Sequence, residues 1–162
     1  MNETWIRRLQ PEDMDAIAAL NTECFGGPSE AAITRRLHAA NDAQLSLIAH
    51  RQNDVVGHIE FFRVLIDGMP SGIGLGPMCV KPEVQGRGIG SGLVRMGLLA
   101  LGGRGESIVF VLGDPDYYGR FGFTAAAAAP FRAPWSGPAF MARPINPGAP
   151  ASGELTYPAA FG

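Results

Sequence analysis

The stretch that decides the fold runs from Leu75 to Ser91 and has the sequence LGPMCVKPEVQGRGIGS. The segment Gly74–Val80 has no charge on either face, which predicts a strand buried on both sides. The Gly-rich turn Gln85–Gly90 follows, and apolar residues at helical spacing then predict a helix over Ser91–Leu101. Successive glycines let backbone N–H groups converge, and a helix start adds unpaired donors. The sequence therefore predicts an anion site suited to a pyrophosphate. The alternative is a tight turn that needs glycine for steric reasons alone.

Two familiar phosphate-binding loops do not fit this turn. A P-loop requires Gly-Lys-Ser/Thr at the helix start, but the only lysine of the chain, Lys81, precedes the turn. A dinucleotide-binding Rossmann loop requires glycine at the sixth position counted from Gly86, and that position holds Ser91. A dinucleotide-dependent oxidoreductase is therefore the weakest alternative.

The elements around the turn indicate an α/β domain. A second apolar strand, Ile108–Leu112, follows the predicted helix, so strand, helix and strand form a βαβ unit with parallel strands and a right-handed crossover. Ser29 is the expected N-cap of an upstream helix. The upstream elements are a strand, two helices and two antiparallel strands, over Trp5–Leu9, Pro11–Phe25, Ser29–Ala40, Leu45–His50 and Val55–Ile66.

The composition excludes several classes of protein. The 162 residues include 13 Lys+Arg and 15 Asp+Glu, for a net charge of −2, which argues against a basic nucleic-acid arm. Two cysteines, Cys24 and Cys79, with three histidines predict neither a disulfide framework nor a metal site. The sequence has no apolar run typical of a signal peptide or a membrane span. We therefore expect a cytoplasmic domain without nucleic-acid or membrane partners.

The last segment of the chain is rich in proline. After Thr124 only Arg132, Arg143 and Glu154 are charged, but aromatic residues are frequent, which predicts packed irregular chain with short strands around Phe140 and Leu155. Apolar exposure in this segment is compatible with a homodimer. We expect one domain over 1–162, divided into N-terminal strands and helices, a binding core and a Pro-rich segment, over 1–72, 73–123 and 124–162.

Two motifs carry a resemblance to a known family. Gln85–Gly90 resembles the Gln/Arg-x-x-Gly-x-Gly/Ala signature of the GNAT superfamily of acetyl-CoA-dependent N-acetyltransferases, and Tyr118–Phe123 resembles the family's Tyr-x-x-x-Gly-Phe segment. Leu75–Glu83 and Phe110–Tyr118 are similar to the YhbS-like branch. The resemblance covers most of the chain. It implies the α/β GNAT fold, a mixed, mostly antiparallel twisted sheet with helices on both faces and a splayed central pair of parallel strands.

The resemblance also implies a reaction and a set of site residues. An acetyl group would pass from acetyl-CoA, as co-substrate, to a primary amine of a small molecule or peptide by direct attack. Tyr118 would protonate the departing thiolate as general acid, with local packing of its ring as the alternative. The implied cofactor-binding residues are Met78, Cys79 and Val80 through their backbone, and Gln85, Gly86, Arg87, Gly88, Ile89, Gly90 and Ser91 at the turn.

A base that removes the amine proton is harder to find. Some members of the family have a glutamate early on the strand before the turn, where this chain has Gly72, Gly74 and Gly76. Glu60 is the catalytic candidate instead, and it shares one strand face with His58. The alternatives are a solvated face for Glu60, a hydrogen-bonded core histidine, and proton loss through ordered water. The missing base leaves a second function open, a non-catalytic acyl-CoA sensor with the same fold.

Overall fold

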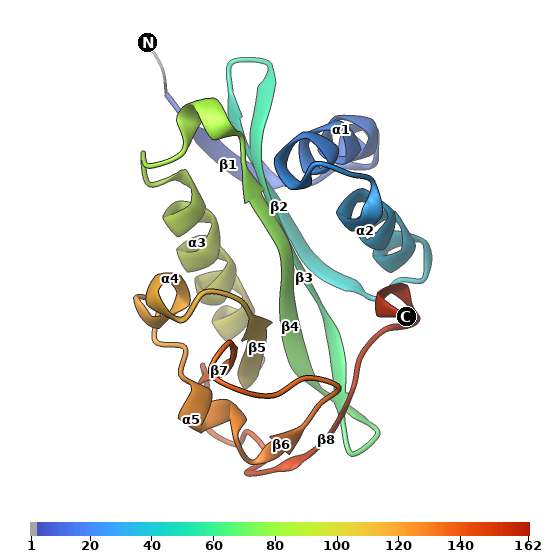
Figure 1. Cartoon of the computed structure of the whole chain (residues 1–162), viewed down its shortest axis with the longest axis vertical. Helices are drawn as coiled ribbons and strands as arrows, with labels where there is room; N and C mark the ends of the chain where they lie inside the picture. The colour runs from blue at the N-terminus through green and yellow to red at the C-terminus, as the bar shows by residue number, and fades with distance from the viewer. Residues whose placement is uncertain (1–2) are drawn as a thin grey trace.

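The computed structural model of the chain describes residues 3–162 and contains a twisted sheet with helices on both faces (Figure 1). The strands are β1 (Trp5–Arg8), β2 (Ala43–Arg51), β3 (Asp54–Ile66), β4 (Met69–Val80), β5 (Ile108–Leu112), β6 (Phe131–Arg132), β7 (Phe140–Pro144) and β8 (Gly153–Thr156). The helices are α1 (Met14–Phe25), α2 (Ser29–Ala39), α3 (Ile89–Gly103), α4 (Pro115–Gly119) and α5 (Ala125–Ala128), with 3₁₀ turns at Pro11–Asp13, Pro82–Val84 and Ala159–Phe161.

The order of strands along the sheet is β1-β2-β3-β4-β5-β7, with β8 paired to the end of β3 and to β6. All neighbours in the main path are antiparallel except β4 and β5, which are parallel and joined through α3. This arrangement confirms the predicted mixed sheet with a central parallel pair.

The N-terminal part follows the sequence prediction with one correction. Gly26, in the left-handed conformation (φ 72°), ends α1 immediately before Gly27 and Pro28. The prediction that Ser29 caps α2 is wrong, because Ser29 is the first helical residue. Pro28 occupies the N-cap position, and no side chain of the described residues 3–162 caps the helix.

Strand β4 begins five residues earlier than the sequence indicated. Residues Asp67 and Gly68 both have positive φ and form a tight turn, so the chain returns at once to pair with β3. Gly74 lies under the ring of Phe62, and a Cβ atom there would come within 2.2 Å of that ring. Glycine at this position therefore allows close packing of β4 against its neighbour, and the strand crosses the boundary expected at residue 72.

The C-terminal segment is packed, as predicted. Strand β7 extends the sheet beyond β5, and β8 pairs with the end of β3, which confirms strands around Phe140 and Leu155. The alanine run Ala125–Ala128 folds as α5, and Thr124 caps it by accepting a hydrogen bond from the Ala127 N–H at 3.1 Å.

The sheet has one hydrophobic core on each face, and helices cover both faces (Figure 1). Helix α3 packs on the first face against residues of β2 to β5, with Gly97 so close to Phe61 that a Cβ atom would lie 2.2 Å from its ring. The second face is covered by α1 and α2 (Figure 1) and by aromatic residues of the C-terminal segment. Within residues 3–162, no helix is long and apolar enough to span a membrane.

Candidate functional site

The Gly-rich turn ends at the start of α3 in a conformation that leaves backbone donors free. Gly86 and Gly88 have left-handed φ values of 76° and 84°, and Gly88 is the N-cap of the helix. Within residues 3–162, no side chain caps α3. A Cβ atom on Gly88 would have no other atom within 4 Å, so the space beside the turn is open. The first N–H groups of the helix therefore face an open region with the positive end of the helix dipole behind them.

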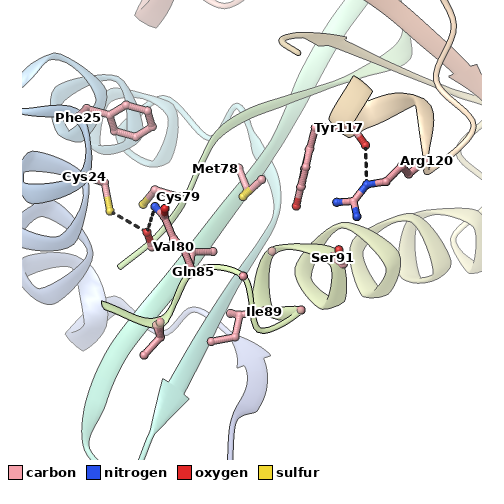
Figure 2. A pocket seen from close by; sticks show the side chains of 14 residues that line it. Cys24, Phe25, Met78, Cys79, Val80, Gln85, Ile89, Ser91, Tyr117 and Arg120 are labelled. Carbon is pink, nitrogen blue, oxygen red and sulfur yellow. Dashed lines mark hydrogen bonds between the residues drawn. The ribbon is translucent and has the colours of Figure 1, made fainter. Parts of the chain in front are cut away.

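A cavity of about 530 Å³ lies beside this turn (Figure 2). The end of α1, the last residues of β4, the turn, the start of α3 and helix α4 surround it. It is lined by Cys24, Phe25, Met78, Cys79, Val80, Val84, Gln85, Gly86, Gly88, Ile89, Gly90, Ser91, Tyr117 and Arg120. The structure thus brings nine of the ten predicted cofactor-binding residues together. The exception is Arg87, which is exposed and does not line the cavity.

Strand β4 has a free edge along this cavity. Its parallel pairing with β5 extends from Ile73 to Leu75 and stops there. Its antiparallel pairing with β3 continues to Val80. The residues after Leu75 are therefore paired on one side only, and the predicted splaying of the two parallel strands is present.

The hydrogen-bond pattern shows which backbone groups point along that edge. The Lys81 N–H donates to the Val56 carbonyl on β3 at 2.8 Å. Because the direction alternates along a strand, Cys79 directs its backbone toward β3, whereas Met78 and Val80 direct theirs away from it. The prediction of a free backbone therefore fits Met78 and Val80. For Cys79 it needs correction, because its backbone faces β3.

Side chains fix the turn against β4. The Gln85 amide donates to the Val80 carbonyl at 3.0 Å, and the Cys24 thiol donates to the same oxygen at 3.5 Å (Figure 2). The Gln85 side chain therefore binds β4 and holds the turn in position relative to the free edge of that strand. Burial raises the pKa of the Cys24 thiol, and burial likewise raises the pKa of the Cys79 thiol. Both groups are therefore neutral at physiological pH and are poor nucleophiles.

The two tyrosines of α4 face different cavities. Tyr117 lines the first cavity, with the Arg120 guanidinium 4.7 Å from the centre of its ring. Its hydroxyl lies over the start of α3, where a Cβ atom on Gly90 would be 2.6 Å from it. Tyr118 lines a second cavity of about 380 Å³, and the rings of the two tyrosines are perpendicular, 5.0 Å apart.

Tyr118 lines the second cavity, which adjoins the first. Phe25 and Met78 line both cavities. Burial, with a smaller contribution from Tyr117, raises the pKa of Tyr118 to about 12. The phenol therefore keeps its proton over the physiological range and can act as a hydrogen-bond or proton donor.

Glu60 lies outside both cavities, in a buried polar network. Its carboxylate is 2.8 Å from His58 Nε2 and 2.9 Å from His38 Nε2, and it accepts a hydrogen bond from the Ser46 hydroxyl at 2.7 Å. The network continues from His58 Nδ1 to the Asn21 amide at 3.1 Å. Glu60 and His58 are fully buried, so neither is on a solvated face and neither reaches the cavities.

The network shifts the pKa values of its members. Burial alone would raise the pKa of the Glu60 carboxyl, but hydrogen bonds from His38 and His58 outweigh it, and the pKa is lowered. The hydrogen bond to Glu60 raises the pKa of His38. The contacts form a hydrogen-bonded network that links α2 to the sheet through His38. A role for Glu60 as the base stays a prediction, and it would require proton exchange through a histidine.

Five residues of the first cavity were not selected from the sequence: Cys24, Phe25, Val84, Tyr117 and Arg120. Cys24 and Phe25 belong to the end of α1, more than 50 residues before the free edge of β4, and no local pattern relates them to the turn. Tyr117 and Arg120 stand within or beside the Tyr118–Phe123 motif, so that motif was the available signal. Within residues 3–162 no cluster of metal-ligating side chains is present.

The sequence is similar to known acetyltransferases. The family model described as an acetyltransferase (GNAT) domain matches residues 5–126. The Escherichia coli K12 protein named uncharacterized N-acetyltransferase YjhQ is 39% identical over 120 residues, which are 71% of this chain and 66% of YjhQ. The E. coli protein named uncharacterized N-acetyltransferase YhbS is 34% identical over 134 residues, which are 82% of this chain and 80% of YhbS.

Two solved structures are similar over nearly the whole chain. The crystal structure of YhbS from E. coli in complex with CoA has a TM-score of 0.91 at 30% identity. The match covers 99% of this chain and 93% of the YhbS chain. A GNAT family acetyltransferase from Brucella melitensis in complex with acetyl-CoA has a TM-score of 0.86 at 36% identity, with all of both chains covered.

Proposed function

The chain belongs to the GNAT acetyltransferase family, and from this premise we propose that it transfers an acetyl group from acetyl-CoA to a primary amine. One observation supports the proposal most strongly: the open cavity that joins the unpartnered helix start of α3 to the free edge of β4. A long ligand with an anionic diphosphate at one end and amides along its arm matches these two features in order.

The turn would hold the diphosphate. The N–H groups at the start of α3 have no side-chain cap within residues 3–162, and the space over Gly88 is open. Backbone donors at a helix start bind phosphate oxygens well because they combine hydrogen bonding with the helix dipole. The residues present therefore fit acetyl-CoA at this end.

The free edge of β4 would hold the pantetheine arm. The N–H and C=O groups of Met78 and Val80 point away from β3 and are available to the amides of the arm, as a neighbouring strand would use them. The Val80 carbonyl is the exception, because it already accepts hydrogen bonds from Gln85 and Cys24, so Met78 offers the least occupied groups.

When bound, acetyl-CoA supplies an activated acyl thioester. The backbone N–H of Met78, preorganised by its strand, would polarise the carbonyl. Tyr118, which keeps its proton because burial raises its pKa to about 12, would donate to the sulfur as the thiolate leaves. Met78 lines both cavities and Tyr118 lines the second, so they would act from adjoining sides of the reacting bond.

A sensor that binds acyl-CoA without turnover is the second candidate. It is favoured because Glu60, the candidate base for the transfer, lines neither cavity. Release of free thiol from acetyl-CoA on addition of amines distinguishes the two functions. We expect release by the wild type and a 10²- to 10³-fold slower release by Tyr118→Phe at unchanged acetyl-CoA affinity. Tight binding with no release for any amine would favour the sensor.

A further inference from the structure

The second cavity has a distinctive chemistry. Apolar and aromatic side chains form most of its wall, including Phe25, Ile33, Phe62, Trp135, Tyr157 and Phe161. Among the described residues that line it, only Glu30 is charged at neutral pH. At about 380 Å³ it falls in the range of small-molecule sites and can hold a ligand the size of an arylalkyl group.

The aromatic part of the wall is built as a packed cluster. The Trp135 ring packs edge-on against Tyr157, with centroids 4.6 Å apart, and Phe62 lies 4.6 Å from Phe161. The indole Nε1 of Trp135 is buried and makes no hydrogen bond within residues 3–162, although it lies near the Tyr157 hydroxyl. Rings held this way give an apolar ligand a fixed surface at little entropic cost.

The position of this cavity links it to the transfer reaction. Met78 and Phe25 line both cavities, and Tyr118 lines this one. A molecule in the second cavity would therefore lie beyond the thioester end of a ligand that follows the free edge of β4. This is the place from which an acceptor must approach the carbonyl carbon.

Glu30 gives the cavity a preference for positive charge. It lies in the first turn of α2, and within residues 3–162 no basic side chain forms an ion pair with it. Primary amines are cations at neutral pH. A carboxylate beside aromatic faces attracts an ammonium through both ion pairing and cation–π contact. A hydrocarbon acyl chain, in contrast, would gain nothing from Glu30.

We propose that the second cavity is the acceptor site and that the acceptor is a primary amine with an aromatic body, whose ammonium group pairs with Glu30. The inference rests on the proposed function. The transfer forms the N–C bond and breaks the C–S bond, so that an ammonium and a thioester give an amide, a free thiol and one released proton. Glu30 is a recognition residue here, and the aromatic wall selects the body of the amine.

The test uses calorimetry on the full chain saturated with CoA, with 2-phenylethylamine, ethanolamine and the neutral 2-phenylethanol as probes. We expect 2-phenylethylamine to bind at least tenfold more tightly than ethanolamine. Glu30→Gln should weaken 2-phenylethylamine about tenfold and leave 2-phenylethanol unchanged, because only the charged contact is lost. Glu23→Gln, on the exposed side of α1, is the matched control and should change neither affinity.

Three results would decide against the inference or its premise. Equal binding of the two amines, or no effect of Glu30→Gln, would overturn the acceptor assignment and leave the proposed function intact. Tenfold tighter binding of octanoyl-CoA than of acetyl-CoA, in wild type and variant alike, would assign the cavity to an acyl chain instead. Failure of acetyl-CoA itself to bind would overturn the proposed function, and titration of the free chain with 2-phenylethylamine would then test the cavity separately.

Discussion

The two halves of β4 are continuous in sequence but differ in their strand pairing and in their role. From Ile73 to Leu75 the strand pairs with β3 on one side and with β5 on the other, and these residues are buried. From Gly76 to Val80 it keeps β3 alone, and its free backbone borders a cavity. Where the pairing of β4 with β5 ends, β4 changes from a core strand to a strand with one edge available for binding. The end of this pairing therefore locates the site.

The change from one half to the other coincides with an irregularity in β3. The register between β3 and β4 shifts at Glu60, where Gly76 and Pro77 have no regular partner. The polar network of Glu60 with His38, His58 and Ser46 lies at this position. We interpret the network as the anchor of the bulge, which keeps the paired half and the open half in their different states.

The largest expected effect concerns the open region. Gly88→Val should reduce acetyl-CoA affinity at least 100-fold, because the new side chain would fill the space in front of the helix N–H groups and the φ of 84° disfavours a branched residue. Titration calorimetry measures the affinity. Gly148→Val is the matched control, since Gly148 is also exposed, has a φ of 93° and has open space where a Cβ atom would lie. Equal affinity in the two variants would contradict this role of the turn.

A substitution in the paired half of β4 should change stability and leave binding unchanged. Gly74→Ala should lower the free energy of unfolding by about 3 kcal/mol, since its Cβ atom would overlap the Phe62 ring in a packed core. Urea denaturation measures this loss. The folded variant should bind acetyl-CoA normally, because Gly74 precedes the free edge. A large loss of affinity at unchanged stability would show that the two halves are not separate.

A smaller effect is expected at the bulge. Glu60→Gln should lower the free energy of unfolding by about 2 kcal/mol, because the charged acceptor of three hydrogen bonds is lost in a buried site. If Glu60 anchors the bulge only, kcat should change less than fivefold when measured well below the unfolding temperature. A 100-fold lower kcat in a stable variant would instead support Glu60 as the base.

The same network predicts a pH dependence of stability. The pKa of His38 is raised above its unfolded value of 6.5, so its contribution is complete below pH 6.5 and is lost as the pH rises through the folded-state pKa. The pKa of Glu60 is lowered, so its contribution is present above its unfolded value of 4.5 and is lost at more acidic pH. The stability difference between wild type and Glu60→Gln should therefore be largest between about pH 4.5 and 6.5, and a difference independent of pH would contradict this.

The smallest expected effect concerns the pH profile of kcat/KM, which should stay level at alkaline pH. Because burial raises the pKa of Tyr118 to about 12, kcat/KM should rise as the amine loses its proton and then stay level to about pH 10.5. Thiol release over roughly pH 6 to 10.5 measures the profile. A descending limb near pH 9 that disappears in Tyr118→Phe would mean that Tyr118 has a lower pKa than its burial implies.

The order of the central elements could be predicted from the sequence, but the contacts between distant elements could not. The Gly-rich turn between an apolar strand and helix, followed by Ile108–Leu112, was sufficient for the βαβ unit. The approach of Cys24 to Val80, across 56 residues, and the early start of β4 depend on tertiary packing, which no local pattern records. Glu60 could be placed on a strand face, but whether that face is open depends on α2 and His38.

Amide hydrogen exchange tests the contrast between the two halves of β4 most directly. In the free protein, the amides of Met78 and of Gly88–Ser91 should exchange rapidly, while those of Ile73 and Leu75 are protected. Saturation with CoA should slow the first group at least tenfold and leave the second unchanged. Protection by CoA elsewhere on the chain, with Met78 and the turn unaffected, would contradict the account.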